Sequence, residues 1–294
     1  MSEVMSSLGF GIVTASVLLP AAVGFTMQFS TTNVLNIAFG SQMTFAAFIA
    51  LVCTQHGVGI WPALVIAGVF GAASSALLNR GLLAPFVRRG TSFFGMIVIT
   101  IALALVIEYL VEVIWGPNSS SYPLQGGSPL RLGSMIFSQE QLVVIAIGVA
   151  TAVGTHALLR YTRIGKAMRA VAANKALAQS CGIRAQRVTD FAWAVSGLMS
   201  GLAGVMLAIS VSSLSFTMGD TFLIEIIAAA ILGGVGQIYG AMVGALVIGV
   251  LLEESAIVLS GAYAPIAAFV ILILVLLVRP TGLFAGAAKV KGIA

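Results

Sequence analysis

The sequence contains little charge. Only 8% of its 294 residues are Asp, Glu, Lys or Arg, whereas about 25% is usual in a soluble domain. Apolar residues make up 60% of the chain, more than the roughly 45–50% that a water-soluble fold accommodates. The formal net charge of +5 therefore does not indicate nucleic-acid binding, because no soluble domain is present to carry a basic face.

Residues that support metal or catalytic chemistry are also scarce. The chain has two cysteines and two histidines without metal-ligand spacing, and no serine or cysteine is visibly paired with a histidine. The phosphate-binding pattern G-x-x-x-x-G-K-[ST] is absent as well. We therefore expect no metal site, no cofactor bound by this chain and no enzymatic activity of the chain alone.

Long apolar runs are abundant. A bilayer core about 30 Å thick takes about 20 apolar residues per helix, and such runs follow one another almost end to end. They are continuous, unlike the alternating strands of a membrane barrel. The sequence predicts an all-α polytopic membrane protein, a single transmembrane domain over 1–294 with about eight to ten segments. Our working count is nine, at residues 8–29, 33–54, 60–79, 92–114, 140–159, 188–210, 221–237, 240–258 and 262–278.

Three of these runs differ from a simple span. Runs 221–237 and 262–278 are the shortest, and asparagine and glycine interrupt 33–54. Non-helical backbone at membrane depth is tolerated only where it lines a cavity or is buried in protein. We expect half-helices or re-entrant segments at these three places.

Basic residues predict the orientation. Thirteen of the fourteen Lys and Arg residues fall within 80–89, 160–187 and 279–291, and Arg131 is the exception. With nine spans all three clusters lie on one side, which the positive-inside rule makes the cytosol. The chain is then a multi-pass protein of the cytoplasmic (inner or plasma) membrane, with its N-terminus outside and its C-terminus cytosolic. Segment 115–139, rich in turn formers, becomes an irregular extracytoplasmic loop.

Two intramembrane features are candidates for a polar pathway. Asn33, Asn36 and Gln42 interrupt an apolar run, where they either line a cavity or cap a helix at the membrane interface. Glu225 lies within another apolar run. Because inserting a carboxylate into lipid costs at least about 2.5 kcal/mol, we expect Glu225 to face the bundle interior or a water-filled path.

The basic segment 160–187 predicts a short cytosolic helix between Gly165 and Gly182. A basic cytosolic loop usually fixes topology or meets anionic lipid. This one also carries an apolar stripe that includes Met168 and Val171, which favours docking to a soluble partner.

Small residues at four-residue spacing predict close helix packing in lipid, although glycine is common in membrane helices generally. The glycines expected at such contacts are Gly197, Gly201, Gly236, Gly240 and Gly244.

These segments together resemble the permeases of branched-chain amino-acid ABC importers, a family that includes urea and short-amide permeases. Residues 36–40 match an N-x-A-H-G-like motif, and 162–170 match a T-x-x-G-x-A-x-R-A loop. Residues 229–244 match a glycine-rich A-A-x-L-G-G-x-G run, and 279–284 match an R-P-x-G-L-F close. Four motifs in this order, spread over nearly the whole chain, make the resemblance specific.

The resemblance implies a pore formed by two such permeases, either paralogues or copies. It also implies two cytosolic ATPases, which bind ATP and magnesium, and an extracytoplasmic substrate-binding protein. Segment 163–183 then resembles the coupling element that seats in an ATPase groove. The residues expected to serve this coupling are Arg163, Gly165, Lys166, Arg169, Ala170, Asn174 and Gly182.

Two positions depart from the family pattern. Phe39 stands where the family usually has histidine, and Glu225 stands where many members have lysine. With Asn33, Asn36 and Gln42, they make up the expected translocation path. The substrate stays open among branched-chain or other small amino acids, a cationic or neutral amino compound, and urea or a short amide. An alternative from another class, a self-sufficient secondary carrier or channel, requires intramembrane ionisable residues, and Glu225 is its one strong candidate.

Overall fold

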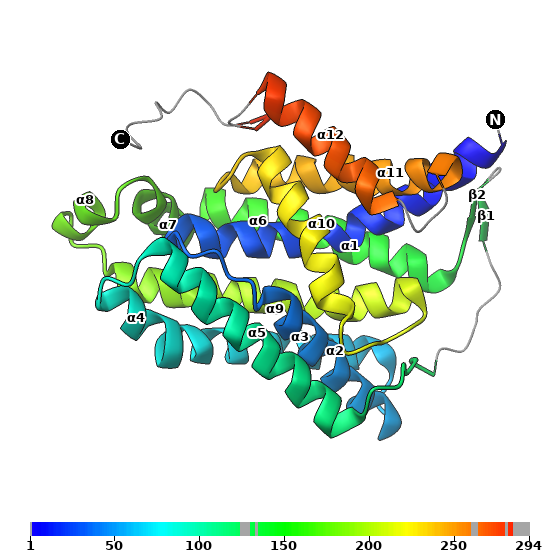
Figure 1. Ribbon diagram of the computed structural model, residues 1–294, viewed down its shortest axis with the longest axis horizontal. Coiled ribbons are helices and arrows are strands. Elements are labelled where there is room, and N and C mark those ends of the chain that lie inside the picture. Colours follow the sequence, from blue (N-terminus) through cyan, green and yellow to red (C-terminus); the bar gives the residue numbers. More distant parts are fainter. Residues whose placement is uncertain (1, 124–129, 133–134, 260–263, 280–281, 285–294) are drawn as a thin grey trace.

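The computed structural model describes residues 2–123, 130–132, 135–259, 264–279 and 282–284, and nearly all of them are helical (Figure 1). Lys289 and Lys291 of the third basic cluster lie outside the described residues. The helices are α1 (Ser2–Thr32), α2 (Phe39–Gln55), α3 (Ile60–Leu78), α4 (Ala84–Arg88), α5 (Phe93–Trp115), α6 (Gln139–Tyr161), α7 (Arg163–Ala173), α8 (Lys175–Ser180), α9 (Ala185–Val211), α10 (Met218–Gly233), α11 (Ile238–Leu259) and α12 (Ala264–Val278), and the π-helical turn η1 (Asn79–Leu83) joins α3 to α4.

Each predicted segment overlaps one of the longer helices. Six helical stretches of the described chain are long and apolar enough to cross a membrane: Ser7–Thr32, Ile60–Arg88, Phe93–Trp115, Gln139–Tyr161, Ala185–Val211 and Ile238–Ala256. Helices α2, α10 and α12 have 17, 16 and 15 residues, so at about 1.5 Å per residue they are shorter than a 30 Å core. These three are the runs that the sequence marked as short or interrupted. The all-α membrane fold is confirmed.

Helices α1 and α9 form the centre of the bundle. Helix α1 packs against α11, α9 and α6, and α9 also packs against α3. Most side chains of α1 and α9 are buried, whereas α5 and α6 expose apolar side chains such as Phe94, Val113 and Val153. Exposed apolar surface on this scale fits a hydrocarbon surrounding rather than water.

The contact between α3 and α9 depends on glycine. A Cβ added to Gly197 would overlap the carbonyl group of Gly71, and a Cβ added to Gly201 would overlap the carbonyl group of Ala67. The two backbones therefore touch directly, which is how small residues let helices associate in lipid.

The other glycines expected at helix contacts lie where α10 meets α11. Gly240 and Gly244 of α11 face the backbone of Gly233 and Ala229 in α10, with no room for a Cβ on either glycine. Gly236 instead lies in the turn between the two helices with φ +82°, a conformation that glycine adopts without strain.

The end of the described chain returns to this turn. The backbone N–H of Leu283 donates to the carbonyl oxygen of Leu232 at 2.9 Å, and that of Phe284 donates to Gly233 at 3.3 Å. The last carbonyl groups of a helix have no partner within it, so these two bonds complete the C-terminus of α10. The glycine-rich run and the R-P-x-G-L-F close, far apart in sequence, therefore meet in space.

The prediction of a single short helix between Gly165 and Gly182 is wrong. This segment forms two helices, α7 and α8. Asn174 separates them with an extended backbone (φ −160°), and its side-chain oxygen accepts a hydrogen bond from the N–H of Leu177 at 3.0 Å. Asparagine favours this capping role over a helix interior, since its amide competes for backbone hydrogen bonds.

The loop 115–139 is more regular than predicted. Strands β1 (Leu130–Leu132) and β2 (Met135–Phe137) pair antiparallel. Both strands are largely apolar in sequence, and a Gly-Ser pair, typical of turns, separates them. The hydroxyl of Tyr122 donates to the carbonyl oxygen of Ala47 at 2.9 Å, which ties the loop to α2.

The two ends of the molecule differ in charge. Helices α4, α7 and α8 and the C-terminal end of α12 lie at one end, which brings together the described members of the three basic clusters (Figure 1). The N-terminus and the β1–β2 hairpin, which contains Arg131, lie at the opposite end. We call these the basic end and the hairpin end.

Candidate functional site

The chain leaves the helical conformation between α1 and α2. Helix α1 ends at Thr32, Asn33 has a left-handed backbone (φ +56°), and α2 begins only at Phe39. This segment returns from the basic end towards the middle of the molecule, where α2 starts (Figure 1). Asn33 and Asn36 are therefore not the N-cap of α2; that position is Ala38, which makes no side-chain cap bond.

The N-termini of α2 and α10 meet inside the bundle. Gly40 and Gly219 approach so closely that a Cβ on either would overlap the carbonyl of the other. The Asp220 carboxylate accepts a hydrogen bond from the Ser41 hydroxyl at 2.7 Å, and the N–H of Gly219 donates to Thr44 Oγ1 at 2.9 Å. A helix N-terminus carries unpaired N–H groups and partial positive charge, so the carboxylate of Asp220 stabilises the start of α2.

Three predicted pathway residues are buried within the subunit. The Asn36 amide donates to Gln28 Oε1 at 3.0 Å, and the Gln28 amide donates to Ser75 Oγ at 3.2 Å. The side chain of Gln42 is buried without a hydrogen-bond partner among the described residues, and Phe39 is fully buried against α1. None of the three lines the cavities described below, and their role in a pathway stays a prediction.

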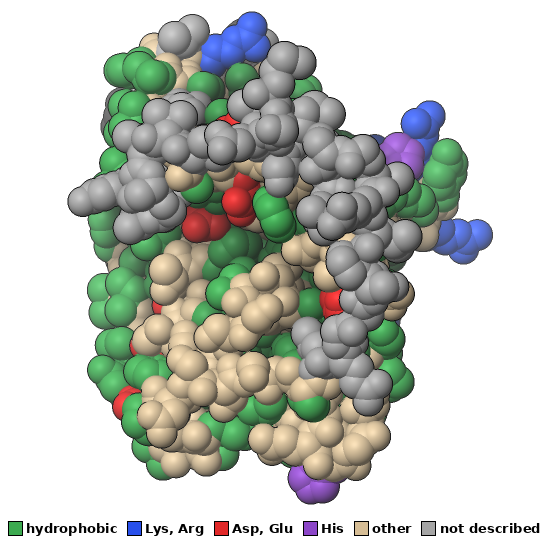
Figure 2. Space-filling view, turned by 90° about the vertical axis from the view of Figure 1, so that its right-hand side faces the viewer, with side chains coloured by type: hydrophobic (Ala, Val, Ile, Leu, Met, Phe, Trp, Pro, Cys, Tyr) green, Lys and Arg blue, Asp and Glu red, His purple; other side chains and the backbone are tan. Residues whose placement is uncertain are grey.

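The first cavity is an outer cavity in the half of the molecule towards the hairpin end. Glu225 of α10 and Glu253 of α11 border a space of about 330 Å³, together with Thr14 and Ser210. The Thr14 hydroxyl donates to the Glu253 carboxylate at 2.7 Å. Figure 2 looks onto the hairpin end, where acidic side chains lie beside a hollow in the surface. Glu225 therefore faces a space within the bundle, as its cost in lipid predicts.

A second, middle cavity of about 170 Å³ is almost wholly apolar. Ile227, Ala230 and Ile231 of α10 form one wall of this space. The side chains of Phe25, Leu35 and Phe93 contribute to the opposite side. A polar solute finds few hydrogen-bond partners in this cavity.

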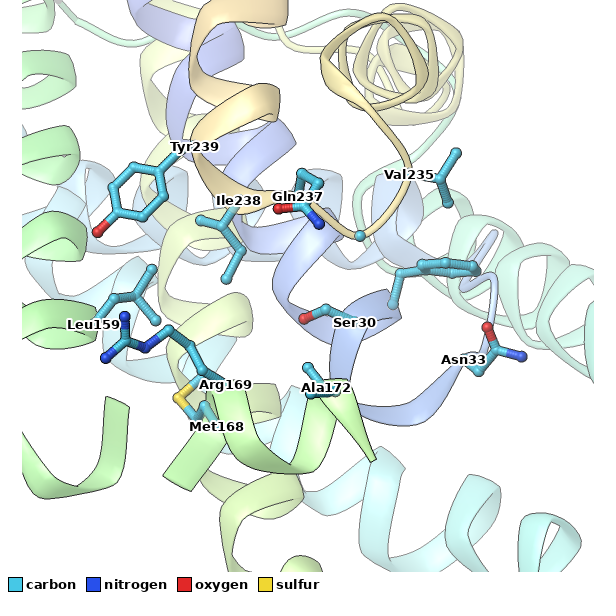
Figure 3. Close-up of a pocket in the computed structure, with 13 residues that line it drawn as sticks. Ser30, Asn33, Leu159, Met168, Arg169, Ala172, Val235, Gln237, Ile238 and Tyr239 are labelled. Atoms are coloured by element: carbon cyan, nitrogen blue, oxygen red, sulfur yellow. The ribbon is translucent and has the colours of Figure 1, made fainter. Parts of the chain in front are cut away.

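The third, inner cavity lies towards the basic end and measures about 410 Å³ (Figure 3). It lies between the end of α1, the α6–α7 corner and the turn from α10 to α11. Phe29, Val235 and Gly236 border both the inner and the middle cavity, so the two spaces adjoin. The polar groups that line the inner cavity are Ser30, Asn33, Arg169, Gln237 and Tyr239.

Helix α7 joins α6 at a corner that leaves no free space. Thr162 Oγ1 accepts a hydrogen bond from the N–H of Gly165 at 3.0 Å and donates to the carbonyl oxygen of Leu158 at 2.6 Å. A Cβ on Gly165 would overlap that carbonyl oxygen and lie 2.7 Å from the Cα of Leu159. Helix α7 therefore meets the end of α6 through direct backbone contacts.

The side chains of α7 face in three directions. Met168 and Val171 are buried against the bundle, whereas Arg163 and Lys166 are exposed. Arg169 lines the inner cavity, and its side chain reaches towards the end of α6 (Figure 3). The basic residues predicted for coupling thus divide into an outward pair and one residue that faces the cavity.

The remaining residues predicted for coupling are uncharged, and their contribution is to the structure of α7 and α8. Ala170 is half-buried on α7, and Asn174 caps α8. Gly182 follows α8 with φ +82°, which ends that helix.

Comparison with known proteins identifies the family. The sequence profile described as "Branched-chain amino acid transport system / permease component" matches residues 7–279. The chain belongs to this family. Among relatives of the branched-chain permease, the probable branched-chain amino acid transport permease protein LivH of Methanocaldococcus jannaschii is 29% identical, over 92% of this chain and 90% of the relative. LivH of Salmonella typhimurium, named as a high-affinity branched-chain amino acid transport system permease protein, is also 29% identical, over 93% and 92%.

A solved structure shares the fold of the branched-chain permease. PsaBC from Streptococcus pneumoniae, in complex with a Fab, superposes with a TM-score of 0.52 over 92% of this chain and 91% of that one, at 10% identity. Family membership makes the protein a multi-pass membrane permease subunit of an ABC importer, which works with other components of the transporter and is not itself an enzyme. Membership of this family also disfavours the alternative hypothesis of a self-sufficient secondary carrier or channel.

Proposed function

We propose that this branched-chain permease forms the path by which branched-chain or other small amino acids, delivered by a binding protein, enter the cytosol. Two partner ATPases drive the transport through α7 and α8, and a second permease, a paralogue or another copy, completes the pore. The observation that carries the proposal is the inner cavity, because it brings the predicted coupling helix α7 against the turn at the end of α10.

The same contacts supply a route for coupling. ATP binding closes the ATPase pair and displaces α7, whose exposed Arg163 and Lys166 are available to the ATPase surface. The tight corner at Gly165 passes the displacement to α6. Met168 and Arg169 border the same space as the α10–α11 turn, so the displacement also changes the inner cavity. The bundle then switches between outward-facing and inward-facing states.

The proposed topology has nine spans, the N-terminus outside and the C-terminus cytosolic. Its support is the basic end, since the positive-inside rule assigns clustered arginine and lysine to the cytosol. The hairpin end then faces the binding protein. The short helices α2 and α10 meet within the membrane, as half-helices do in other transporters.

The outer cavity favours a substrate that carries a positive amino group. Two carboxylates, Glu225 and Glu253, border it, and a small anion would be repelled there unless the second permease supplied a cation. Urea or a short amide is the second candidate, because an uncharged polar solute is not repelled by either carboxylate.

Reconstitution tests the proposal. The complete complex, with both permeases, both ATPases and the binding protein, is placed in liposomes, and uptake of radiolabelled leucine and urea is compared with and without ATP. We expect ATP-dependent leucine uptake. Uptake of urea alone would favour the second candidate. The permease proposal itself would fail if this chain, purified without an ATPase, moved substrate down an ion gradient.

A further inference from the structure

The inner cavity has the chemistry of a site for an amino-acid carboxylate. We infer that Arg169 binds the carboxylate of the substrate in this cavity before release to the cytosol. The inference rests on the proposed function and deepens it, because it assigns to a residue of the coupling helix a direct contact with the substrate.

Arg169 has no ion-pair partner among the residues that the structure describes. Arg169 is the one charged side chain among the described residues that line the cavity. Within the described part of the chain it forms no ion pair; the ion pair found there joins Arg80 to Asp190 at 2.9 Å. A guanidinium group presents two parallel N–H donors that match the two oxygens of a carboxylate. The cavity therefore offers an anion site that none of the described residues fills.

Uncharged polar groups line the same cavity as Arg169. Ser30 of α1 and Tyr239 of α11 contribute hydroxyl groups, and Asn33 and Gln237, in the segments after α1 and before α11, contribute side-chain amides. Figure 3 shows these side chains on both sides of the space above α7. Amide and hydroxyl oxygens accept hydrogen bonds from an ammonium group. A zwitterion is thus matched at both of its charged groups without a buried carboxylate of the protein.

An apolar space adjoins the inner cavity. The middle cavity shares Phe29, Val235 and Gly236 with the inner cavity, and Ile227 and Ile231 form its wall. An aliphatic side chain placed there leaves water, which is favourable, while the charged end of the molecule stays in the inner cavity. A polar compartment next to a small apolar one fits an amphipathic amino acid better than urea.

The position of Arg169 on α7 gives the site a function in the transport cycle. A displacement of α7 carries Arg169 relative to the α10–α11 turn, so the affinity for the carboxylate differs between the two states of the bundle. Movement of the coupling helix thereby releases the substrate.

Protection of a thiol tests the inference directly. In the complete complex without nucleotide, Cys53→Ala and Cys181→Ser remove the native thiols, and Ala172→Cys places a single one at the cavity. The rate of its modification by a water-soluble thiol reagent is measured with added leucine or leucinamide. Leucinamide keeps the amino group and the side chain but lacks the carboxylate. We expect leucine to slow modification and leucinamide to protect at least about tenfold less well, as loss of a charge-assisted hydrogen-bonded pair requires.

Arg169→Gln and Arg89→Gln are the matched variants. Both remove one exposed positive charge at the basic end, but Arg89 borders none of the three cavities described above. We expect protection by leucine to disappear with Arg169→Gln and to persist with Arg89→Gln, while the ATPases co-purify with both. Equal protection by leucine and leucinamide, or leucine protection that survives Arg169→Gln, would overturn the inference. Because the assay needs no ATP, its failure can be told apart from failure of the proposed function. If the Ala172→Cys complex takes up leucine in an ATP-dependent way but leucine does not protect its thiol, the inference alone is refuted and the proposed function stands.

Discussion

A single methyl group at the α6–α7 corner should uncouple transport. In Gly165→Ala the new Cβ meets the carbonyl oxygen of Leu158 and lies 2.7 Å from the Cα of Leu159. Both are backbone atoms, so no side-chain rotation relieves the overlap. Overpacking of this kind costs about 1–3 kcal/mol, and the higher helix propensity of alanine returns at most about 1 kcal/mol.

The overpacking cost exceeds the gain in helix propensity, so Gly165→Ala favours displacement of α7 from its docked position against α6. A net cost of up to about 2 kcal/mol lowers the equilibrium constant for docking of α7 by as much as roughly thirtyfold. We expect ATP-driven uptake to fall by a similar factor when it is measured in proteoliposomes as substrate moved per ATP hydrolysed. Co-purification of the ATPases, measured on the same samples, should weaken in parallel.

Gly154→Ala on α6 is the matched control. A Cβ at Gly154 has no atom within 4 Å, so this variant gains the same helix propensity without an overlap. It should transport as the unmodified protein does. If Gly165→Ala and Gly154→Ala show equal uptake and equal ATPase binding, the corner does not transmit motion and the coupling route proposed for α7 is refuted.

Variants at three further positions test other parts of the structure. Glu225→Gln and Glu225→Ala should reduce initial uptake at low substrate concentration because the outer cavity loses a charge, and unchanged uptake would leave Glu225 a structural role only. Gly201→Leu should abolish the monodisperse peak in size-exclusion chromatography, since the side chain collides with the backbone of Ala67; a normal elution profile would contradict the α3–α9 contact. Asp220→Ala removes a charged hydrogen-bond partner of Ser41, a loss of about 1.5–3 kcal/mol, so thermal unfolding in detergent should begin several degrees lower. An unchanged Tm would show that Asp220 does not stabilise α2.

The long helices were predictable because a bilayer imposes length and composition on them. The predicted span 92–114 and the observed helix Phe93–Trp115 differ by one residue at each end. The start of α2 was not predictable in the same way. Val34, Leu35 and Ile37 are apolar enough to continue a helix, and the amide contact of Asn36 with α1 joins residues that no local pattern links.

In the candidate site, too, features set by neighbouring residues were predictable, whereas contacts between residues far apart in the sequence were not. Asn174 is a cap signal that the sequence contains, and it marks the break between α7 and α8. In the sequence, Asp220 is an acidic residue directly before the apolar run 221–237. In the structure its carboxylate accepts a hydrogen bond from Ser41, which lies 179 positions earlier. The motifs around Arg169 and Gly236 were each found in the sequence, but their meeting at one cavity is a property of the folded chain.

The hydrogen bonds from Leu283 and Phe284 to the end of α10 also bear on biosynthesis. The ribosome completes α10 about fifty residues before it makes the donors that satisfy the carbonyl groups of Leu232 and Gly233. Until then these oxygens, next to the inner cavity, depend on water or on the insertion machinery. A polypeptide truncated before residue 283 lacks both donors, so only chains translated through residue 284 can complete the hydrogen bonding at this end of α10.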